Sequence, residues 1–465
     1  MLKKGSLMLP KTEPNYNFYI AKGRLPVVDH ARGIRIWDTD GKEYIDACSG
    51  AVISNIGYGR SGINDAIQEQ AQNTFFAYRL HFENQPALDY SKALVENSAP
   101  HLQRVFFVSG GSEAVESAMK LCRQYFYDNH QGSRHIFISR VPSYHGCTLG
   151  TLALTGYAPL EAPYRPLMKS YPKIPAPYCY RCAYHLAYPE CDLACARQLE
   201  KTVVEQGPEN VAGFIAEPVG GASTGALVPP EGYFDIIQDT CRKYGIMLIL
   251  DEVMTGFGRT GRLFGYEHWN IEADIVALSK GMASGYFPLG AVMARNSIVE
   301  TVLNSGGFKH GHTYAGNPMA CAVGLKVLRI ILDEDLCANA GNMGMRLKKG
   351  LEKLARKIPV IGQVRGKGLL LGVELVQDPD TREPFPVESN AGQLLTDIAF
   401  EGGLIIYPRR PINGVSGDHV LLAPPLTVTE PEVDEILSRF SKALQKTAGR
   451  LGIPGGNAEA LDTNR

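Results

Sequence analysis

The chain has 465 residues, a formal net charge of −1 at pH 7 and 45% hydrophobic residues. A chain of this length can bury a large core and form more than one domain. The balanced charge excludes a strongly basic surface, so we expect no nucleic-acid or membrane-surface partner. The first residues lack the apolar region of a signal peptide, and no stretch reaches the roughly 20 apolar residues of a membrane span, which favours a cytoplasmic protein.

The hydrophobic pattern predicts short strands that alternate with helices, as in an α/β fold. In the first half, the predicted elements are a hairpin at 33–47 that turns at Asp40-Gly41, helical segments within 64–101, a strand at 104–108, a helix after Ser112, strands at 135–139 and 210–217, and a helix at 233–244. In the second half, they are strands at 246–250, 275–278 and within 285–295, helices at 297–303, 322–332 and 336–357, a hairpin at 364–375, a helix at 391–401, strands at 404–408 and 419–428, and a helix at 432–445.

Two apolar strands of the central stretch end in charged residues, Asp251 and Lys280. An open α/β sheet places its chemistry in the crevice beyond the carboxyl ends of its strands. Taken alone, Asp251 could be a cap and Lys280 a solvated surface lysine. Together, with glycines after each, they indicate a site for something flat and anionic. A partly neutral lysine can form a Schiff base with an aldehyde, and an aspartate beneath a pyridine nitrogen keeps it protonated, which describes a pyridoxal phosphate site.

A phosphate cradle is predicted where the strand at 104–108 is followed by SGGS and an amphipathic helix. Free N–H groups and the positive end of the helix dipole can bind an anion there. Gly110 and Gly111 let the backbone come close, and the Ser112 hydroxyl can donate to a phosphate oxygen. Because serine is also a common helix N-cap, the four residues alone are a weak signal.

Three motifs carry a family resemblance: DEVMTGFGRTG at 251–261, ALSKGMASGYFPLGAV at 277–292 and HTYAGNP at 312–318. They resemble the class III, or omega, aminotransferases of fold type I, and the similarity extends from about residue 33 to about residue 437. The resemblance implies a large domain at 60–325 with a mostly parallel sheet flanked by helices. It also implies a smaller α+β domain formed by 1–59 and 326–448, and we expect 449–465 to be a disordered tail.

The resemblance also assigns roles around the cofactor. It implies that Tyr144 stacks on the ring, that His145 completes the same turn, and that Val253 packs on the opposite face. Glu217 would lie near the ring hydroxyl as supporting structure. Thr313 would bind the phosphate of the neighbouring subunit's cofactor, which implies a homodimer or a homotetramer with shared active sites.

Four residues are candidates for binding substrate: Tyr19, Val52, Arg409 and Arg410. Many relatives have tryptophan where Val52 falls, so Val52 either gives the pocket another shape or is a packing residue. Many omega aminotransferases place an arginine near 409–410 that pairs with a substrate carboxylate and swings aside for an uncharged amine. Either Arg409 or Arg410 could fill this role, or both could be solvated.

The expected activity is transfer of an amino group by pyridoxal 5′-phosphate from an ω-amino acid, a diamine or taurine to a keto acid, with pyruvate as the acceptor by family analogy. An aminomutase, a racemase or a decarboxylase could use the same lysine and aspartate, and a non-catalytic relative is a further alternative. Stoichiometric consumption of an external keto acid would separate the first three from a transaminase.

Four cysteines within seventeen positions remain outside this scheme: Cys179, Cys182, Cys191 and Cys195. Their spacing, C-x2-C-x8-C-x3-C, is not a standard zinc pattern, and the loop between the pairs is short. Unligated thiols are therefore favoured over a structural metal, and no metal is assigned to the chain.

Overall fold

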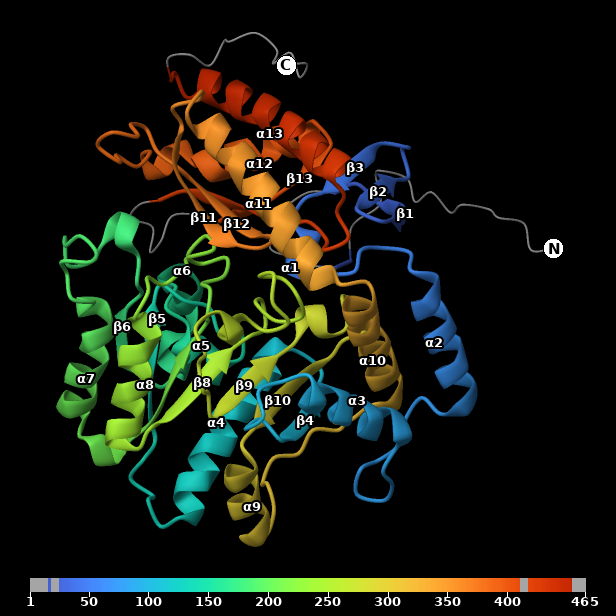
Figure 1. Cartoon of the computed structure of the whole chain (residues 1–465), viewed down its shortest axis with the longest axis vertical. Helices are drawn as coiled ribbons and strands as arrows, with labels where there is room; N and C mark the ends of the chain where they lie inside the picture. Colours follow the sequence, from blue (N-terminus) through green and yellow to red (C-terminus); the bar gives the residue numbers. More distant parts are fainter. Residues whose placement is uncertain (1–15, 18–24, 410–416, 454–465) are drawn as a thin grey trace.

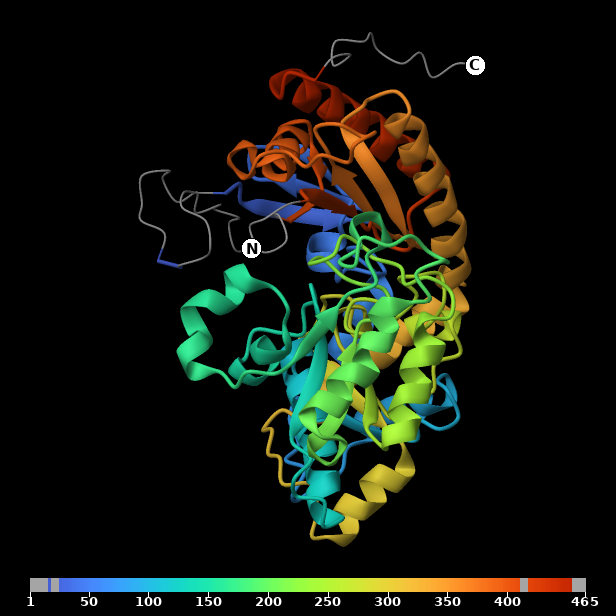
Figure 2. The ribbon, with the colours of Figure 1, turned by 90° about the vertical axis from the view of Figure 1, so that its left-hand side faces the viewer.

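The computed structural model describes residues 16–17, 25–409 and 417–453, with the side chain of Arg409 left out. Figure 1 shows a lower body built on one large sheet and an upper body that contains both the N-terminal strands and the C-terminal helices. Figure 2 shows the same division from the side, with blue N-terminal strands beside orange and red C-terminal elements. Among the described helices, none combines the length and the apolar character that a membrane span needs.

The lower body contains a seven-stranded sheet with the strand order β4-β10-β9-β8-β7-β5-β6. Only β10 runs against the other strands, so the predicted mostly parallel sheet is confirmed. The strands in this order are β4 (Arg104–Val108), β10 (Gly290–Ala294), β9 (Ile275–Leu278), β8 (Met247–Asp251), β7 (Val211–Ala216), β5 (Ile136–Val141) and β6 (Lys173–Pro175).

Both faces of this sheet are buried, which is why its strands read as continuous apolar runs. Along β8, Ile249 packs into the hydrophobic cluster on the side of α4, whereas Leu248 and Leu250 pack into the main core on the other side. The helices of the lower body are α2 (Ser61–Asn73), α3 (Gln85–Glu96), α4 (Gly111–Asp128), α5 (Leu149–Leu154), α6 (Ala158–Glu161), α7 (Ala194–Gln206), α8 (Tyr233–Tyr244), α9 (Asn296–Asn304) and α10 (Pro318–Asp333).

The upper body contains two four-stranded sheets, β1-β2-β3-β13 and β11-β12-β15-β14. Pairing of β13 with β3 joins the N-terminal hairpin to the C-terminal part of the chain. The elements are β1 (Val28–Arg32), β2 (Arg35–Asp38), β3 (Glu43–Asp46), α1 (Ser49–Val52), α11 (Leu336–Ala355), β11 (Ile361–Lys367), β12 (Leu370–Leu375), α12 (Ala391–Glu401), β13 (Leu404–Ile405), β14 (Tyr407–Arg409), β15 (His419–Leu422) and α13 (Glu430–Arg450).

Several features differ from the sequence-based expectations; α5, β6 and α7, for example, were not predicted. Strand β1 was not predicted, because its residues are mostly exposed and give no alternating pattern. The domain boundary predicted at 325/326 falls inside α10, which packs against α2 and α3, so the division into domains stays a prediction. The predicted tail begins too early: α13 continues to Arg450, and Leu451 and Ile453 pack against the core. Residues 454–465 lie outside the described part of the chain.

Candidate active site

Asp251 and Lys280 lie at the same edge of the large sheet. Asp251 ends β8 and pairs with Ala277 of the parallel strand β9, only three residues before Lys280. Lys280 itself has φ of 45°, a left-handed backbone that a non-glycine residue rarely adopts. Its carbonyl accepts hydrogen bonds from the N–H groups of Ala283 (3.2 Å) and Ser284 (3.0 Å), which hold this conformation. Such a strained residue just beyond the carboxyl end of a strand is typical of a functional position.

The Asp251 carboxylate is buried and oriented by two donors. Nδ1 of His145 donates to Asp251 Oδ2 at 2.8 Å, and the N–H of Val253 donates to Oδ1 at 3.1 Å. The His145 side chain is fully buried, and its Nε2 has no hydrogen-bond partner among the described residues. The sequence placed His145 in a turn without giving it this partner, because 106 residues separate it from Asp251.

The glycine turn before α4 lies against the strand ends that carry Asp251 and Lys280. Helix α4 has no side-chain cap on its first N–H groups. A Cβ atom on Gly111 would lie 2.9 Å from Val253 Cγ1 and 3.6 Å from Ser279 Cβ, so only glycine allows this close approach. Ser112 Oγ accepts a hydrogen bond from the N–H of Cys147 at 3.0 Å, which ties the turn to the segment after His145. The predicted cradle therefore has open amide donors at the correct edge of the sheet.

Glu217 is buried, and it lies close enough to His145 and Asp251 for both to act on its carboxyl. Burial raises the pKa of its carboxyl, while His145 and Arg140 act in the opposite direction. Its Oε1 accepts from the N–H of Gly221 at 2.9 Å, but Oε2 has no hydrogen-bond partner among the described residues. Arg140, which the sequence did not single out, is buried and donates to the Glu217 carbonyl at 2.5 Å.

These residues fit pyridoxal 5′-phosphate. Uncapped amides of α4 suit the phosphate, a buried carboxylate at Asp251 suits a pyridinium nitrogen, and a lysine follows the neighbouring strand. His145 and Glu217 both lie near Asp251, and their polar atoms without a hydrogen-bond partner among the described residues can bind further polar atoms of such a ring.

Other predicted contacts lie nearby. Tyr144 and Val253 are half-buried at the crevice. Thr313 is exposed in the loop before α10, and Nε2 of the preceding His312 lies 3.0 Å from Ser109 Oγ beside the cradle. The loop with Thr313 is therefore held beside the cradle of its own chain.

The predicted substrate residues have different outcomes. Val52 is 1% exposed, has φ of 58° and packs in a small apolar cluster with Val219 and Leu421. Tyr407, two residues before Arg409, packs against the same cluster. The backbone of Arg409 ends strand β14, whereas Tyr19 and Arg410 lie outside the described residues.

A buried network beneath Lys280 was missed by the sequence reasoning. The Arg259 guanidinium is fully buried and donates to Asn55 Oδ1 (2.8 Å) and to the Pro424 carbonyl (2.6 Å). Asn55 in turn donates to the Phe257 carbonyl at 2.8 Å. Arg259 lies within the GFGRTG motif, but its partners come from distant segments and have no local signal. The network joins the loop after β3 to the segment after β8.

The cysteine loop lies apart from this crevice. All four cysteines line one small cavity of about 20 Å³ and are unpaired thiols. Within the described part of the chain, no group of three His, Cys, Asp or Glu side chains is placed to hold a metal ion. That the four thiols are unligated stays a prediction.

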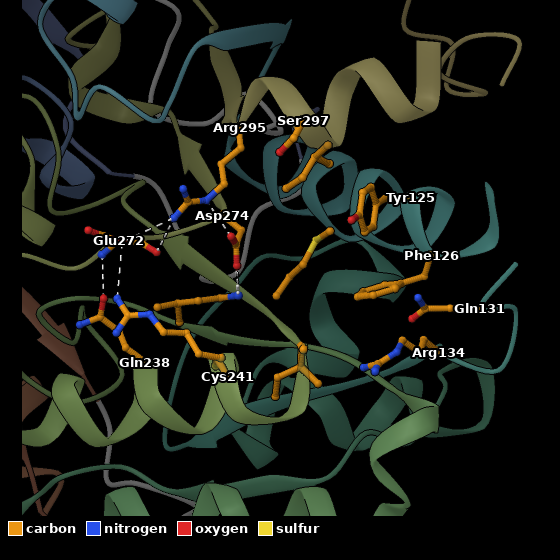
Figure 3. Close-up of a pocket in the computed structure, with 16 residues that line it drawn as sticks. Tyr125, Phe126, Gln131, Arg134, Gln238, Cys241, Glu272, Asp274, Arg295 and Ser297 are labelled. Atoms are coloured by element: carbon orange, nitrogen blue, oxygen red, sulfur yellow. Dashed lines mark hydrogen bonds and ion pairs between the residues drawn. The ribbon is translucent and has the colours of Figure 1, made fainter. Parts of the chain in front are cut away.

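A larger cavity, of about 410 Å³, lies at the amino ends of the strands, opposite the edge with Asp251. Figure 3 shows Arg295 placed between Asp274 and Glu272, and the Arg295 Nε to Asp274 Oδ1 distance is 2.8 Å. Arg242 is also within 4 Å of Glu272. Because these charges are paired with one another, the cavity has no reactive group comparable to Lys280.

Comparison with known proteins identifies the family. Residues 19–444 match the family model described as aminotransferase class-III. An uncharacterized aminotransferase of Bacillus subtilis, YodT, is 40% identical over 421 residues, which cover 90% of this chain and 95% of that protein. The putrescine–pyruvate aminotransferase of Pseudomonas aeruginosa is 36% identical and covers 91% of each chain. A crystal structure of the omega transaminase of Pseudomonas jessenii in complex with PMP is 34% identical, with a TM-score of 0.87 over 93% of this chain and 94% of that one.

Proposed function

Because the chain belongs to the class III aminotransferases and uses pyridoxal 5′-phosphate, we propose that it moves an amino group from an ω-amino acid or a primary amine to a keto acid, with pyruvate as the acceptor. One observation carries the chemical part: Asp251 ends β8, Lys280 follows the neighbouring parallel strand β9, and the buried Glu217 lies close enough to Asp251 to act on it electrostatically and has one unpartnered oxygen among the described residues. The donor and acceptor rest on the named relatives, among them the putrescine–pyruvate enzyme.

The bound cofactor supplies an electron sink for the carbanion formed when the substrate loses its proton. Asp251 keeps the ring nitrogen protonated, and His145 fixes the orientation of the Asp251 carboxylate. The Lys280 amine takes the proton from the substrate carbon as a general base. The protonated amine then donates this proton as a general acid in the next step. In this proposal Gly110, Gly111 and Ser112 bind the phosphate.

Three residues, one of them supported by Arg140, complete the proposed cofactor contacts. Tyr144 and Val253 enclose the ring from its two faces, which fixes its plane. Glu217 binds the ring hydroxyl side, where its free Oε2 accepts a hydrogen bond. The buried pair of Glu217 and Arg140 keeps this part of the crevice rigid.

Substrate recognition is proposed for the face where β14 meets the loop after β3. Val52 and Tyr407 pack in one cluster, so the start of the arginine segment lies beside that loop. We assign the binding of a substrate carboxylate to Arg409 or Arg410 because a guanidinium can bind both oxygens at once. Tyr19 remains a predicted member of this pocket, and a cytoplasmic location remains a prediction as well.

The proposed working unit is a homodimer. A group of exposed apolar side chains, Phe75, Leu80, Phe82 and Tyr314, lies on the link between α2 and α3 and on the loop before α10; each is at least 59% exposed. Phe76 contacts the Tyr314 ring, so these two segments lie side by side. An exposed apolar patch of this kind marks a protein interface, and it adjoins the loop with Thr313.

The activity is tested with a panel of amines against pyruvate and 2-oxoglutarate. We expect putrescine, taurine or an ω-amino acid to give alanine from pyruvate in a one-to-one ratio, and Lys280→Ala to abolish it. Activity confined to α-amino acid donors would overturn the donor assignment. Turnover without keto-acid consumption would indicate an aminomutase, a racemase or a decarboxylase instead.

The arginine assignment has its own measurement. Replacing the correct arginine by alanine should raise KM for pyruvate by about tenfold, the loss expected for one charge-assisted pair. The KM for putrescine should change little, because a diamine has no carboxylate. If Arg409→Ala and Arg410→Ala both leave KM for pyruvate unchanged, neither residue binds the carboxylate.

Subunit mixing tests the shared site. A Lys280→Ala chain and a Thr313→Asp chain should each be inactive alone, because the second places a negative charge at the phosphate. If Thr313 serves the neighbouring site, each mixed dimer has one intact site, and random exchange restores about a quarter of the wild-type activity. No restoration in a verified mixed dimer would show that Thr313 serves its own subunit.

A further inference from the structure

Another cavity, of about 350 Å³, lies between the upper body and the segment that begins the cysteine loop, and neither Asp251 nor Lys280 lines it. Strand β11 and helix α11 form one side of it. Residues of the segment 177–180 and of the loop at 227–228 form the other side. The walls combine aromatic and aliphatic side chains, Tyr178, Tyr180, Leu227 and Val228, with three basic ones, Lys348, Arg365 and Lys367.

The two lysines come together because α11 and the β11–β12 turn approach closely. A Cβ atom on Gly344 would lie 2.1 Å from the Gly368 carbonyl oxygen, so the helix and the turn are in backbone contact. Lys348 lies one helical turn after Gly344 on the same face, and Lys367 directly precedes Gly368. Burial and the neighbouring Lys348 lower the pKa of Lys367.

No carboxylate in the described part of the chain neutralises this pair. Neither Lys348 nor Lys367 has an ion pair or a side-chain hydrogen bond among the described residues, and the described lining contains no Asp or Glu. The ammonium group of Lys367 lies 5.4 Å from the centre of the Trp269 ring instead. In the cavity of Figure 3, by contrast, Arg295 has acidic partners within the lining.

The nearby carboxylate of Glu374 is not available to neutralise the two lysines either, because it is already paired. Arg365 NH1 and Arg181 Nε each lie 2.5 Å from an oxygen of the same carboxylate, that of Glu374. Two guanidinium groups share one carboxylate, so this cluster carries an excess positive charge. The Arg365 guanidinium is buried and also donates to the carbonyls of Thr224 and Gly225, which fixes it beside the cavity.

We propose that this cavity binds a small organic dianion, a dicarboxylate or a phosphate monoester, between Lys348 and Lys367. Two half-buried ammonium groups without a carboxylate suit two negative charges. The tyrosine and aliphatic walls suit an apolar or aromatic remainder, and the volume is within the range of small-molecule sites. The site is separate from the proposed transamination and does not depend on it.

Trp269 gives a direct readout, since the chain has two tryptophans, Trp37 and Trp269. In the Trp37→Phe holoenzyme, titration with inorganic phosphate, phenyl phosphate and succinate at constant ionic strength should change Trp269 fluorescence saturably for at least one probe. Tighter binding of succinate identifies the carboxylate source, and tighter binding of a phosphate probe identifies the phosphate source. Using the holoenzyme keeps the active-site phosphate cradle filled.

The matched control removes the same amount of charge from exposed positions of α11. In the Trp37→Phe background, Lys348→Gln with Lys367→Gln should weaken binding about tenfold or more. Lys349→Gln with Lys353→Gln, both exposed on α11 and outside the cavity, should leave it unchanged. The proposal is wrong if no probe gives a saturable change, or if both double variants bind as the parent does. Transaminase activity is not part of the readout, so failure here is distinct from failure of the proposed function.

Discussion

Gly281, the residue after Lys280, offers a sharp test of how the active-site lysine is positioned. A Cβ atom there would lie 2.3 Å from Asn55 Nδ2 and 3.1 Å from Phe257 Cβ. Gly281→Ala therefore displaces Asn55, which donates to the Phe257 carbonyl and accepts from Arg259. Losing two buried hydrogen bonds costs about 2–3 kcal/mol, and overpacking adds about 1–3 kcal/mol. We expect a total destabilisation of roughly 3–6 kcal/mol, together with loss of activity.

The measurement is urea unfolding at fixed protein and cofactor concentrations, combined with a double-mutant cycle. Asn55→Ala removes the obstacle as well as the hydrogen bonds, so Gly281→Ala in that background should add little further cost. Gly341→Ala is the control, because its Cβ would meet nothing within 4 Å in the middle of α11. It should stabilise the protein by up to about 1 kcal/mol. A Gly281→Ala protein as stable and active as the wild type would refute the reasoning.

Three further outcomes are expected. Asp251→Asn should lower kcat by about 10³. The variant loses roughly 4 kcal/mol of attraction between the carboxylate and the protonated ring nitrogen, taken as opposite charges about 4 Å apart at a dielectric near 20. Cofactor affinity, measured by absorbance titration, should fall less. Gly111→Ala should weaken cofactor binding about tenfold or more, because its Cβ would overlap with Val253; unchanged affinity would contradict the close approach. Burial lowers the pKa of His419 to about 4, below its usual value of about 6.5. The unfolded state therefore binds the proton first, and the free energy of unfolding falls by up to about 3 kcal/mol as pH falls from 6.5 to 4. Urea unfolding of His419→Gln should lack this part of the pH dependence.

The parts of the fold visible from the sequence are those with a strong local pattern. The strands at 104–108 and 275–278 and the helices at 233–244 and 391–401 are confirmed to the residue. A buried parallel strand is a continuous apolar run, and the polar residue at the carboxyl end of this run marks the functional edge of the sheet. The apolar runs that precede Asp251 and Lys280 are therefore sufficient to predict that both residues lie at one edge.

The remaining features depend on contacts between distant segments. His145 has its carboxylate partner at Asp251. Arg259 donates to Asn55, which follows α1, and to Pro424, which follows β15. Lys348 and Lys367 each look like ordinary surface lysines, and only the contact of α11 with the β11–β12 turn brings them together. No spacing rule within the sequence carries such information, because tertiary packing creates it.

The backbone around Lys280 is fixed by contacts within the protein. Ser279 Oγ donates to the Leu289 carbonyl at 2.7 Å, the Lys280 carbonyl is bound by two N–H groups, and Gly281 fits closely against Asn55. The left-handed φ of Lys280 is therefore held by contacts on both sides, and folding contributes free energy to this strained conformation. The same constraint explains why a methyl group at Gly281 should damage the site without touching the cofactor.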